Sequence, residues 1–84
     1  MDNKTLFNLV VNGTSTSVEQ NNNAPLKSII GKALEQTGNT GQPQENWEVR
    51  DEAGNVLDLE RKIGEFGFAD GVKLFISLKT GVAG

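Results

Sequence analysis

The residues whose types and spacing could take part in chemistry stand at the end of the sequence. An alternating strand pattern that ends at Lys79 is followed by Thr80, Gly81, Val82, Ala83 and Gly84. Because glycine has no side chain and accepts almost any backbone conformation, a glycine carboxylate can enter a narrow active site of another protein. The pattern predicts that chemistry occurs at the Gly84 carboxylate, with a frayed glycine-rich terminus as the alternative interpretation.

Residue types that carry catalysis inside a protein are scarce in this sequence. It contains no cysteine and no histidine, which excludes disulfides, zinc-thiolate sites, cysteine nucleophiles and a histidine base. It also lacks a P-loop, a nucleophile elbow and paired carboxylates, and its acidic residues around Glu48 and Asp51 lack the spacing of a calcium-binding loop. We therefore expect no catalytic residue, no metal and no cofactor, and we predict that the protein is not an enzyme.

Length and charge narrow the function classes further. The 84 residues are enough for one domain, and the net charge of −3 argues against a nucleic-acid surface. No apolar run approaches the ~20 residues of a membrane span. The first residues, from Met1 to Lys4, do not have the pattern of a signal peptide. A cytoplasmic monomer that binds neither nucleic acid nor membrane is expected.

The first half of the sequence predicts a hairpin followed by a helix. Residues 5–11 alternate with Phe7, Leu9 and Val11 on one face, and Asn12 before Gly13 is typical of a tight hairpin turn. Residues 14–19 form the returning strand. A helix is expected to begin near Pro25, to be capped by Asn23 or Ala24 and to stop at Gly38, with one apolar stripe made of Leu26, Ile29, Ile30, Ala33 and Leu34.

The second half predicts strands with one short helical turn. Residues 47–51 and 72–79 alternate as strands, residues 56–57 could add a short strand, and Asp58 is a plausible cap for a helical turn through Lys62. One half-buried sheet and one amphipathic helix satisfy each other by packing together, which predicts an α+β domain over residues 1–79 and a tail over 80–84. The first and last strands share an inward apolar set and are expected to lie side by side.

This order, and several motifs in the second half, resemble ubiquitin and the β-grasp fold. The motifs are Leu57-Asp58, Lys62-Ile63, Phe66-Gly67-Phe68, Gly71 and Leu74-Phe75-Ile76-Ser77-Leu78-Lys79 before a glycine tail. Among ubiquitin-like proteins the sequence is most similar to bacterial modifiers encoded with E1, E2 and JAB partners. The resemblance implies a mixed sheet of four to five strands, with one main helix packed across it and a short second helical turn.

The resemblance also implies a function and partners. An E1-like activating enzyme would adenylate the Gly84 carboxylate, an E2-like enzyme would assist its transfer to an amine of a target protein, and a JAB-type protease would remove it. Two departures stand out, because Ala83 occupies the place of the usual first glycine and only Lys79 supplies charge near the tail. A sulfur carrier with a thiocarboxylate on Gly84 and a non-covalent binding module remain as alternatives.

A second candidate site lies on the predicted outer face of the sheet. Alternation directs Leu6, Val10 and Phe75 away from the helix, with Arg50 and Ser77 nearby. An exposed apolar cluster usually marks an interaction surface, although single apolar residues at a surface are ordinary. Ubiquitin binds partners through the same face, and here Arg50 or a neighbour takes the place of its apolar residue on the middle strand. We predict a partner-binding surface at these five residues.

Overall fold

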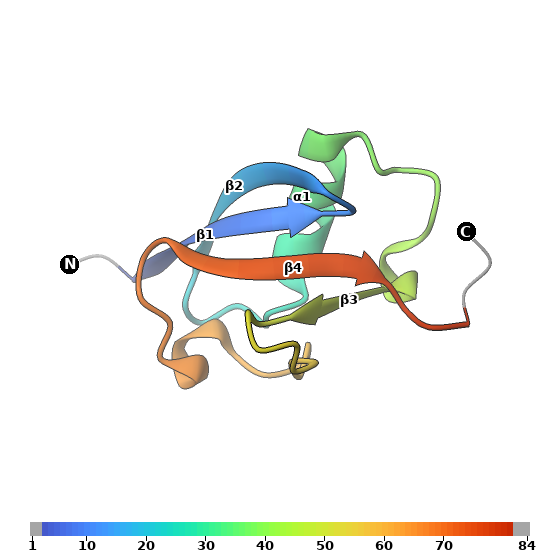
Figure 1. The fold of residues 1–84 in the computed structure, drawn as a ribbon. Coiled ribbons are helices and arrows are strands. Elements are labelled where there is room, and N and C mark those ends of the chain that lie inside the picture. The colour runs from blue at the N-terminus through green and yellow to red at the C-terminus, as the bar shows by residue number, and fades with distance from the viewer. Residues whose placement is uncertain (1–2, 82–84) are drawn as a thin grey trace.

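The computed structural model describes residues 3–81, and in these a single mixed sheet is crossed on one face by a helix (Figure 1). The strands are β1 (Lys4–Val11), β2 (Thr14–Asn21), β3 (Trp47–Arg50) and β4 (Val72–Leu78), and the helix is α1 (Ser28–Thr37). Two short 3₁₀ helices, η1 (Gln44–Asn46) and η2 (Ile63–Phe66), interrupt the connections. The sheet order is β2-β1-β4-β3. This arrangement confirms the predicted ubiquitin-like β-grasp fold.

Strands β1 and β2 form the predicted hairpin. They pair antiparallel through eight successive residue pairs, from Lys4 opposite Asn21 to Val11 opposite Thr14. The turn between them uses positive φ at both central residues, 51° at Asn12 and 89° at Gly13. Asparagine tolerates this conformation better than most residues and glycine adopts it without strain, so the local sequence fixes the register of the hairpin.

Strand β4 lies in the middle of the sheet. It pairs parallel to β1, with Leu9 opposite Leu74, and antiparallel to β3, with Val49 opposite Ile76. The prediction that the first and last strands lie side by side is therefore confirmed. Because β4 is bonded on both sides, the chain that follows it leaves from the centre of the sheet and not from an edge (Figure 1).

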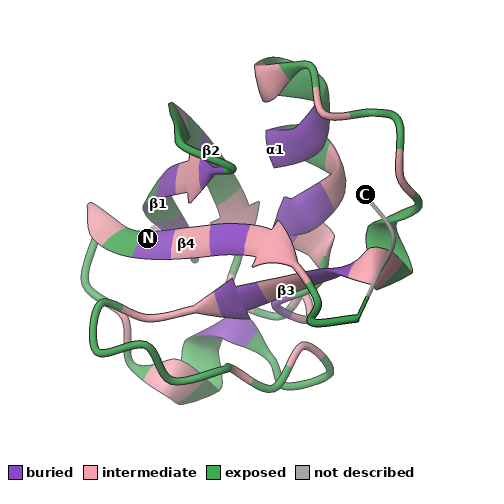
Figure 2. Cartoon of the chain, turned by 45° about the vertical axis from the view of Figure 1, so that its right-hand side comes forward, coloured by how far each residue is buried: buried purple, intermediate pink, exposed green. Residues whose placement is uncertain are grey.

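Helix α1 covers the inner face of the sheet with four residues of the predicted apolar stripe, and the fifth, Leu26, lies just before the helix. The stripe residues are all buried, and they complete a core with the inward residues of the strands, as the purple bands in Figure 2 indicate. The core comprises Phe7, Leu9, Val11, Val18, Leu26, Ile29, Ile30, Ala33, Leu34, Trp47, Val49, Ile63, Leu74 and Ile76. Within residues 3–81 no helix combines the length and apolarity needed to cross a membrane.

The start of the helix is a correction to the sequence prediction. Regular helix begins at Ser28 with Lys27 at the N-cap, so neither Asn23 nor Ala24 caps it. Pro25 instead forms an isolated bridge with Lys62, and the Leu26 N–H donates to Arg61 O at 2.9 Å. This pairing ties Pro25 and Leu26 to the segment that ends at Lys62, and residues 26–27 form a turn that leads into the helix. The predicted C-terminal stop is confirmed, because Gly38 adopts the left-handed conformation with φ 75°.

Two details after β3 also differ from expectation. Val56 makes only an isolated bridge with Arg50, so the possible fifth strand at 56–57 does not form. The short helical turn lies at Ile63–Phe66 and not between Asp58 and Lys62. Asp58 accepts a bond from the Glu60 N–H at 3.0 Å, which stabilises a turn, but Lys62 is extended (ψ 140°) because it bridges to the segment before α1.

Candidate functional site: the outer sheet face and the end of β4

The strand register brings most of the predicted surface residues into one row. On the face opposite α1, Val10 of β1 lies directly beside Phe75 of β4, and Phe75 lies directly beside Arg50 of β3. Ser15 of β2 stands opposite Val10 on the other side and completes a row across all four strands. We call Ser15, Val10, Phe75 and Arg50 the outer row. Val10, Phe75 and Arg50 are half-buried, so each is accessible to a partner.

Leu6 does not join this row. It is 38% exposed at the opposite end of β1, and the polar residue Asn8 stands between it and Val10. The Asn8 side chain is fixed at both ends, since it accepts from Ser17 Oγ at 3.1 Å and donates to Gly71 O at 3.1 Å. The structure therefore brings Val10 and Phe75 together and leaves Leu6 separate.

Cations flank the apolar part of the outer row. Lys73 lies two residues before Phe75 on β4, and its Nζ is 5.6 Å from the centre of the Phe75 ring. Arg50 pairs with Glu48, with Nη2 2.7 Å from Oε2, and donates through Nη1 to Gly54 O at 3.2 Å. Arg50 is thus fixed in place, whereas Lys73 forms no ion pair within residues 3–81.

Ser77, the last of the predicted surface residues, is half-buried on β4 opposite Glu48 of β3. It lies two residues after Phe75 on the same face of β4. Its neighbour across the strands is therefore the anion Glu48 and not Val10 or Phe75. The five predicted residues therefore divide into a connected group, Val10, Phe75, Arg50 and Ser77, and the isolated Leu6.

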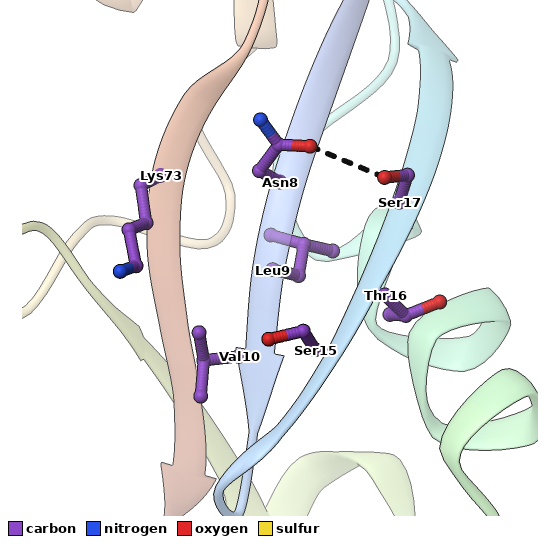
Figure 3. A pocket seen from close by; sticks show the side chains of 7 residues that line it. All are labelled: Asn8, Leu9, Val10, Ser15, Thr16, Ser17 and Lys73. Carbon is purple, nitrogen blue, oxygen red and sulfur yellow. Dashed lines mark hydrogen bonds between the residues drawn. The ribbon is translucent and has the colours of Figure 1, made fainter.

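A shallow hollow of about 410 Å³ adjoins the outer row between β2, β1 and β4 (Figure 3). It is lined by Asn8, Leu9, Val10, Ser15, Thr16, Ser17 and Lys73. The hollow exists because the two β2 residues on this face that line it, Ser15 and Ser17, are small and leave space above the sheet that larger side chains would fill. Ser15, Ser17 and Lys73 were not predicted from the sequence, although the run of alternating Ser and Thr in β2 was a visible signal.

Asp51 stabilises the turn after β3, and a carbonyl of this turn accepts a hydrogen bond from Arg50. Asp51 Oδ1 accepts from the N–H groups of Ala53 at 3.0 Å and Asn55 at 2.9 Å, and Oδ2 accepts from Asn55 Nδ2 at 3.2 Å. These bonds favour the charged carboxylate, so hydrogen bonds from Asn55, first its backbone N–H and then its side chain, lower the pKa of Asp51. The same turn presents the Gly54 carbonyl to Arg50.

A pH-dependent contribution to stability is expected from this turn. Because the pKa of Asp51 is lower in the folded chain, its contribution is present above the unfolded pKa of about 3.9 and is lost as pH falls through the folded value. The Asp51→Asn variant should therefore be less stable than the natural chain at pH 7, with a difference that narrows below about pH 4. Urea unfolding at several pH values measures this difference, and a constant difference would contradict the assignment.

The other predicted site begins where β4 ends. After Leu78 the Lys79 N–H donates to Asn46 O at 2.8 Å, and Thr80 and Gly81 are then exposed, with φ 90° at Gly81. Val82, Ala83 and Gly84 lie outside the described residues. The predicted tail thus follows directly from the central strand.

The described residues offer surfaces for binding. Among residues 3–81, no three Asp, Glu, His or Cys side chains are grouped so that they could hold a metal ion. The outer row supplies an apolar pair and one fixed cation, and beside it lie the unpaired cation Lys73 and a hydroxyl-lined hollow. Such an arrangement can hold another molecule through apolar contact, cation–π contact and hydrogen bonds.

Comparison of the sequence with known families gives one decisive match. The family model DUF2604, described as a protein of unknown function, matches residues 1–84. The chain belongs to the DUF2604 family. A bacterial relative, the uncharacterized protein y4jI of Sinorhizobium fredii (strain NBRC 101917 / NGR234), is 59% identical over 76 residues, which are 90% of this chain and 58% of the relative. The chain therefore spans little more than half the length of that relative.

Solved structures that resemble this DUF2604 chain are ubiquitin-like. A de novo design based on ubiquitin has a TM-score of 0.76 and 20% identity, covering 98% of this chain and 96% of the design. The ubiquitin of Caldiarchaeum subterraneum has a TM-score of 0.73 and 20% identity, covering 96% and 99%. The UBL domain of Plasmodium falciparum Dsk2 has a TM-score of 0.72 and 16% identity, covering 90% and 99%. At these identities the likeness establishes the fold.

Proposed function

We propose that this chain is a ubiquitin-like protein modifier of the bacterial type. An E1-like enzyme uses ATP to adenylate the Gly84 carboxylate and releases pyrophosphate. A cysteine thiolate of that enzyme displaces AMP to form a thioester, and an E2-like enzyme takes part in transfer to a target. A lysine amine of the target attacks the thioester, releases the thiol and forms an isopeptide bond. A JAB-type protease hydrolyses that bond, and the process takes place in the cytoplasm.

The observation that carries this proposal is how the chain leaves the sheet. β4 is bonded to β1 and β3 on its two sides, and the bond from Lys79 N–H to Asn46 O extends this anchorage by one residue. Thr80 and Gly81 are exposed immediately afterwards. A rigid domain followed at once by small residues can hold a carboxylate at a defined distance from an enzyme bound to the domain. In this scheme the chain is the substrate and the catalytic groups belong to the partners.

The outer row gives the partners a surface to recognise. Val10 and Phe75 provide the apolar contact, and Lys73 with Arg50 provides positive charge beside it. This surface also supports the second candidate function, a non-covalent ubiquitin-like module. Such a module would use the outer row and would not need Ala83 or Gly84.

The test is expression of the chain with an amino-terminal tag and with Gly84 as its last residue, in cells of the organism that encodes it. A denaturing, reducing gel is run for this chain and for a chain that lacks Gly84. We expect high-mass adducts that resist reductant, because an isopeptide bond survives thiols, and we expect them to disappear without Gly84.

Intact mass separates the competing functions when adducts are absent. A mass that corresponds to exchange of one terminal oxygen for sulfur would establish a sulfur carrier and overturn the modifier proposal. An unmodified chain that still binds partners through the outer row would instead establish a non-covalent module.

A further inference from the structure

Strand β2 is an edge strand without the usual protection. It borders the sheet on one side, runs for eight residues and pairs with β1 without a bulge. Natural sheets commonly shield such edges with lysine, proline, bulges or very short strands. In β2 the only charged residue is Glu19, and neither lysine nor proline is present.

Hydrogen bonds on the far side of β1 reveal which groups of β2 point outward. The Leu6 N–H donates to Asp70 Oδ1 at 2.9 Å and the Leu6 carbonyl accepts from Gly71 N–H at 2.8 Å, so Leu6 directs its backbone away from β2. Its partner Glu19 is therefore in a non-hydrogen-bonded pair and directs its own N–H and C=O to the free edge. By the same alternation, the backbone N–H and C=O groups of Ser17 and Ser15 also point to the free edge of β2.

These three residues define a binding segment of the edge. One step further, Asn21 is already satisfied, since its N–H donates to Gln20 Oε1 at 2.8 Å and its carbonyl accepts from Ala24 N–H at 3.0 Å. The outward N–H and C=O groups of Ser15, Ser17 and Glu19 have no partner within residues 3–81. Three consecutive donor and acceptor pairs at this spacing match the backbone of one extended strand.

The two sides of this edge are not alike. On the helix side, Thr16 Oγ1 donates to Gln36 Oε1 of α1 at 2.5 Å and Val18 is buried, so that side is closed. On the outer side, the side chains of Ser15 and Ser17 border the hollow of about 410 Å³ that extends to Val10 (Figure 3). A side chain of an added strand that faces Ser17 therefore has open space above β2.

We propose that β2 binds an extended segment of a partner protein, which adds as a fifth strand through Ser15, Ser17 and Glu19. The residue of that segment opposite Ser17 carries a bulky aromatic or aliphatic side chain, which lies over the two serines and contacts Val10 in the hollow. This interaction surface is independent of the Gly84 carboxylate and adjoins the outer row at Ser15.

The experiment uses the full 84-residue chain and a probe heptapeptide, acetylated and amidated, of sequence Lys-Thr-Val-Tyr-Val-Thr-Lys. The peptide is titrated to about 1 mM, and binding is followed by the amide NMR signals of the protein. We expect the largest shifts at the amides of Ser15, Ser17 and Glu19. A second peptide that is N-methylated at the tyrosine amide should bind about tenfold more weakly, because one strand donor is removed.

Two protein variants complete the test. Ser17→Pro removes an outward N–H that β1 does not use, so the hairpin is retained while strand addition weakens about tenfold. Ser17→Ala keeps the N–H and loses only the hydroxyl and its bond to Asn8, so it should weaken binding far less than Ser17→Pro does. An unchanged amide spectrum away from residue 17 verifies that each variant is folded.

Four results would overturn the proposal. The first is the absence of shifts up to the highest peptide concentration. The second is binding that Ser17→Pro leaves unchanged. The third is a set of shifts centred on β3 and β4, which would place the peptide elsewhere. The fourth is a shift of the same three amides with protein concentration alone, which would assign the edge to a second copy of this chain.

Discussion

Replacing Gly84 with valine should reduce covalent adducts about 100-fold or more, without any change in the fold. A branched side chain at the reacting residue collides with the walls of an activating site shaped for glycine, and small misplacements of a reacting carbonyl cost rate factors of that order. Gly84 lies outside the residues that the structure describes. Adduct intensity on denaturing, reducing gels is the measurement, normalised to the amount of free chain.

The matched control for this substitution is Ala83→Gly. It restores the paired glycines usual in ubiquitin-like modifiers and should form adducts at least as well as the natural chain. If Gly84→Val formed adducts at an unchanged level, the attachment point would lie elsewhere.

Phe7→Ala is expected to lower the free energy of unfolding by about 3–5 kcal/mol. Phe7 is fully buried at the centre of β1, between Val18 of β2 and Val72 of β4, and its ring meets Phe68 edge to face at 5.7 Å. An 84-residue domain has a total stability of only about 4–13 kcal/mol, so this loss removes much of it. Urea unfolding followed by the fluorescence of Trp47 measures the change.

The neighbouring residue provides the control for the core substitution. Leu6 is 38% exposed on the opposite face, so Leu6→Ala should change the free energy of unfolding by less than about 1 kcal/mol. Equal losses for the two variants would mean that the alternation of β1 does not separate core from surface. Such a result would contradict the register described above.

Much of the fold could be predicted because the local sequence patterns favour the same conformations that the packing of the whole domain requires. The alternation of Phe7, Leu9 and Val11, the turn at Asn12 and the stop at Gly38 each follow from the sequence within a few residues. The start of α1 could not be predicted in this way. Pro25 satisfies every local rule for a first helical position, but its bridge to Lys62, 37 residues away, holds it outside the helix.

The candidate site was harder to predict from the sequence than the core was. Alternation identified the outer face of each strand, but only the register between strands shows that Val10 and Phe75 are neighbours while Asn8 separates Leu6 from them. The hollow beside Ser15 and Ser17 depends on three strands at once, and no periodicity along one strand indicates it. The free edge of β2 likewise follows from which strands are paired.

The most direct test of the modifier proposal is mass spectrometry of the purified adducts after trypsin digestion. Trypsin cleaves after Lys79, so conjugation through Gly84 leaves residues 80–84, Thr-Gly-Val-Ala-Gly, attached to the ε-amine of a target lysine. We predict target peptides that carry this remnant on lysine, and their absence when Gly84 is deleted. Adducts whose peptides instead retain Gly84 as a free carboxylate would contradict the account.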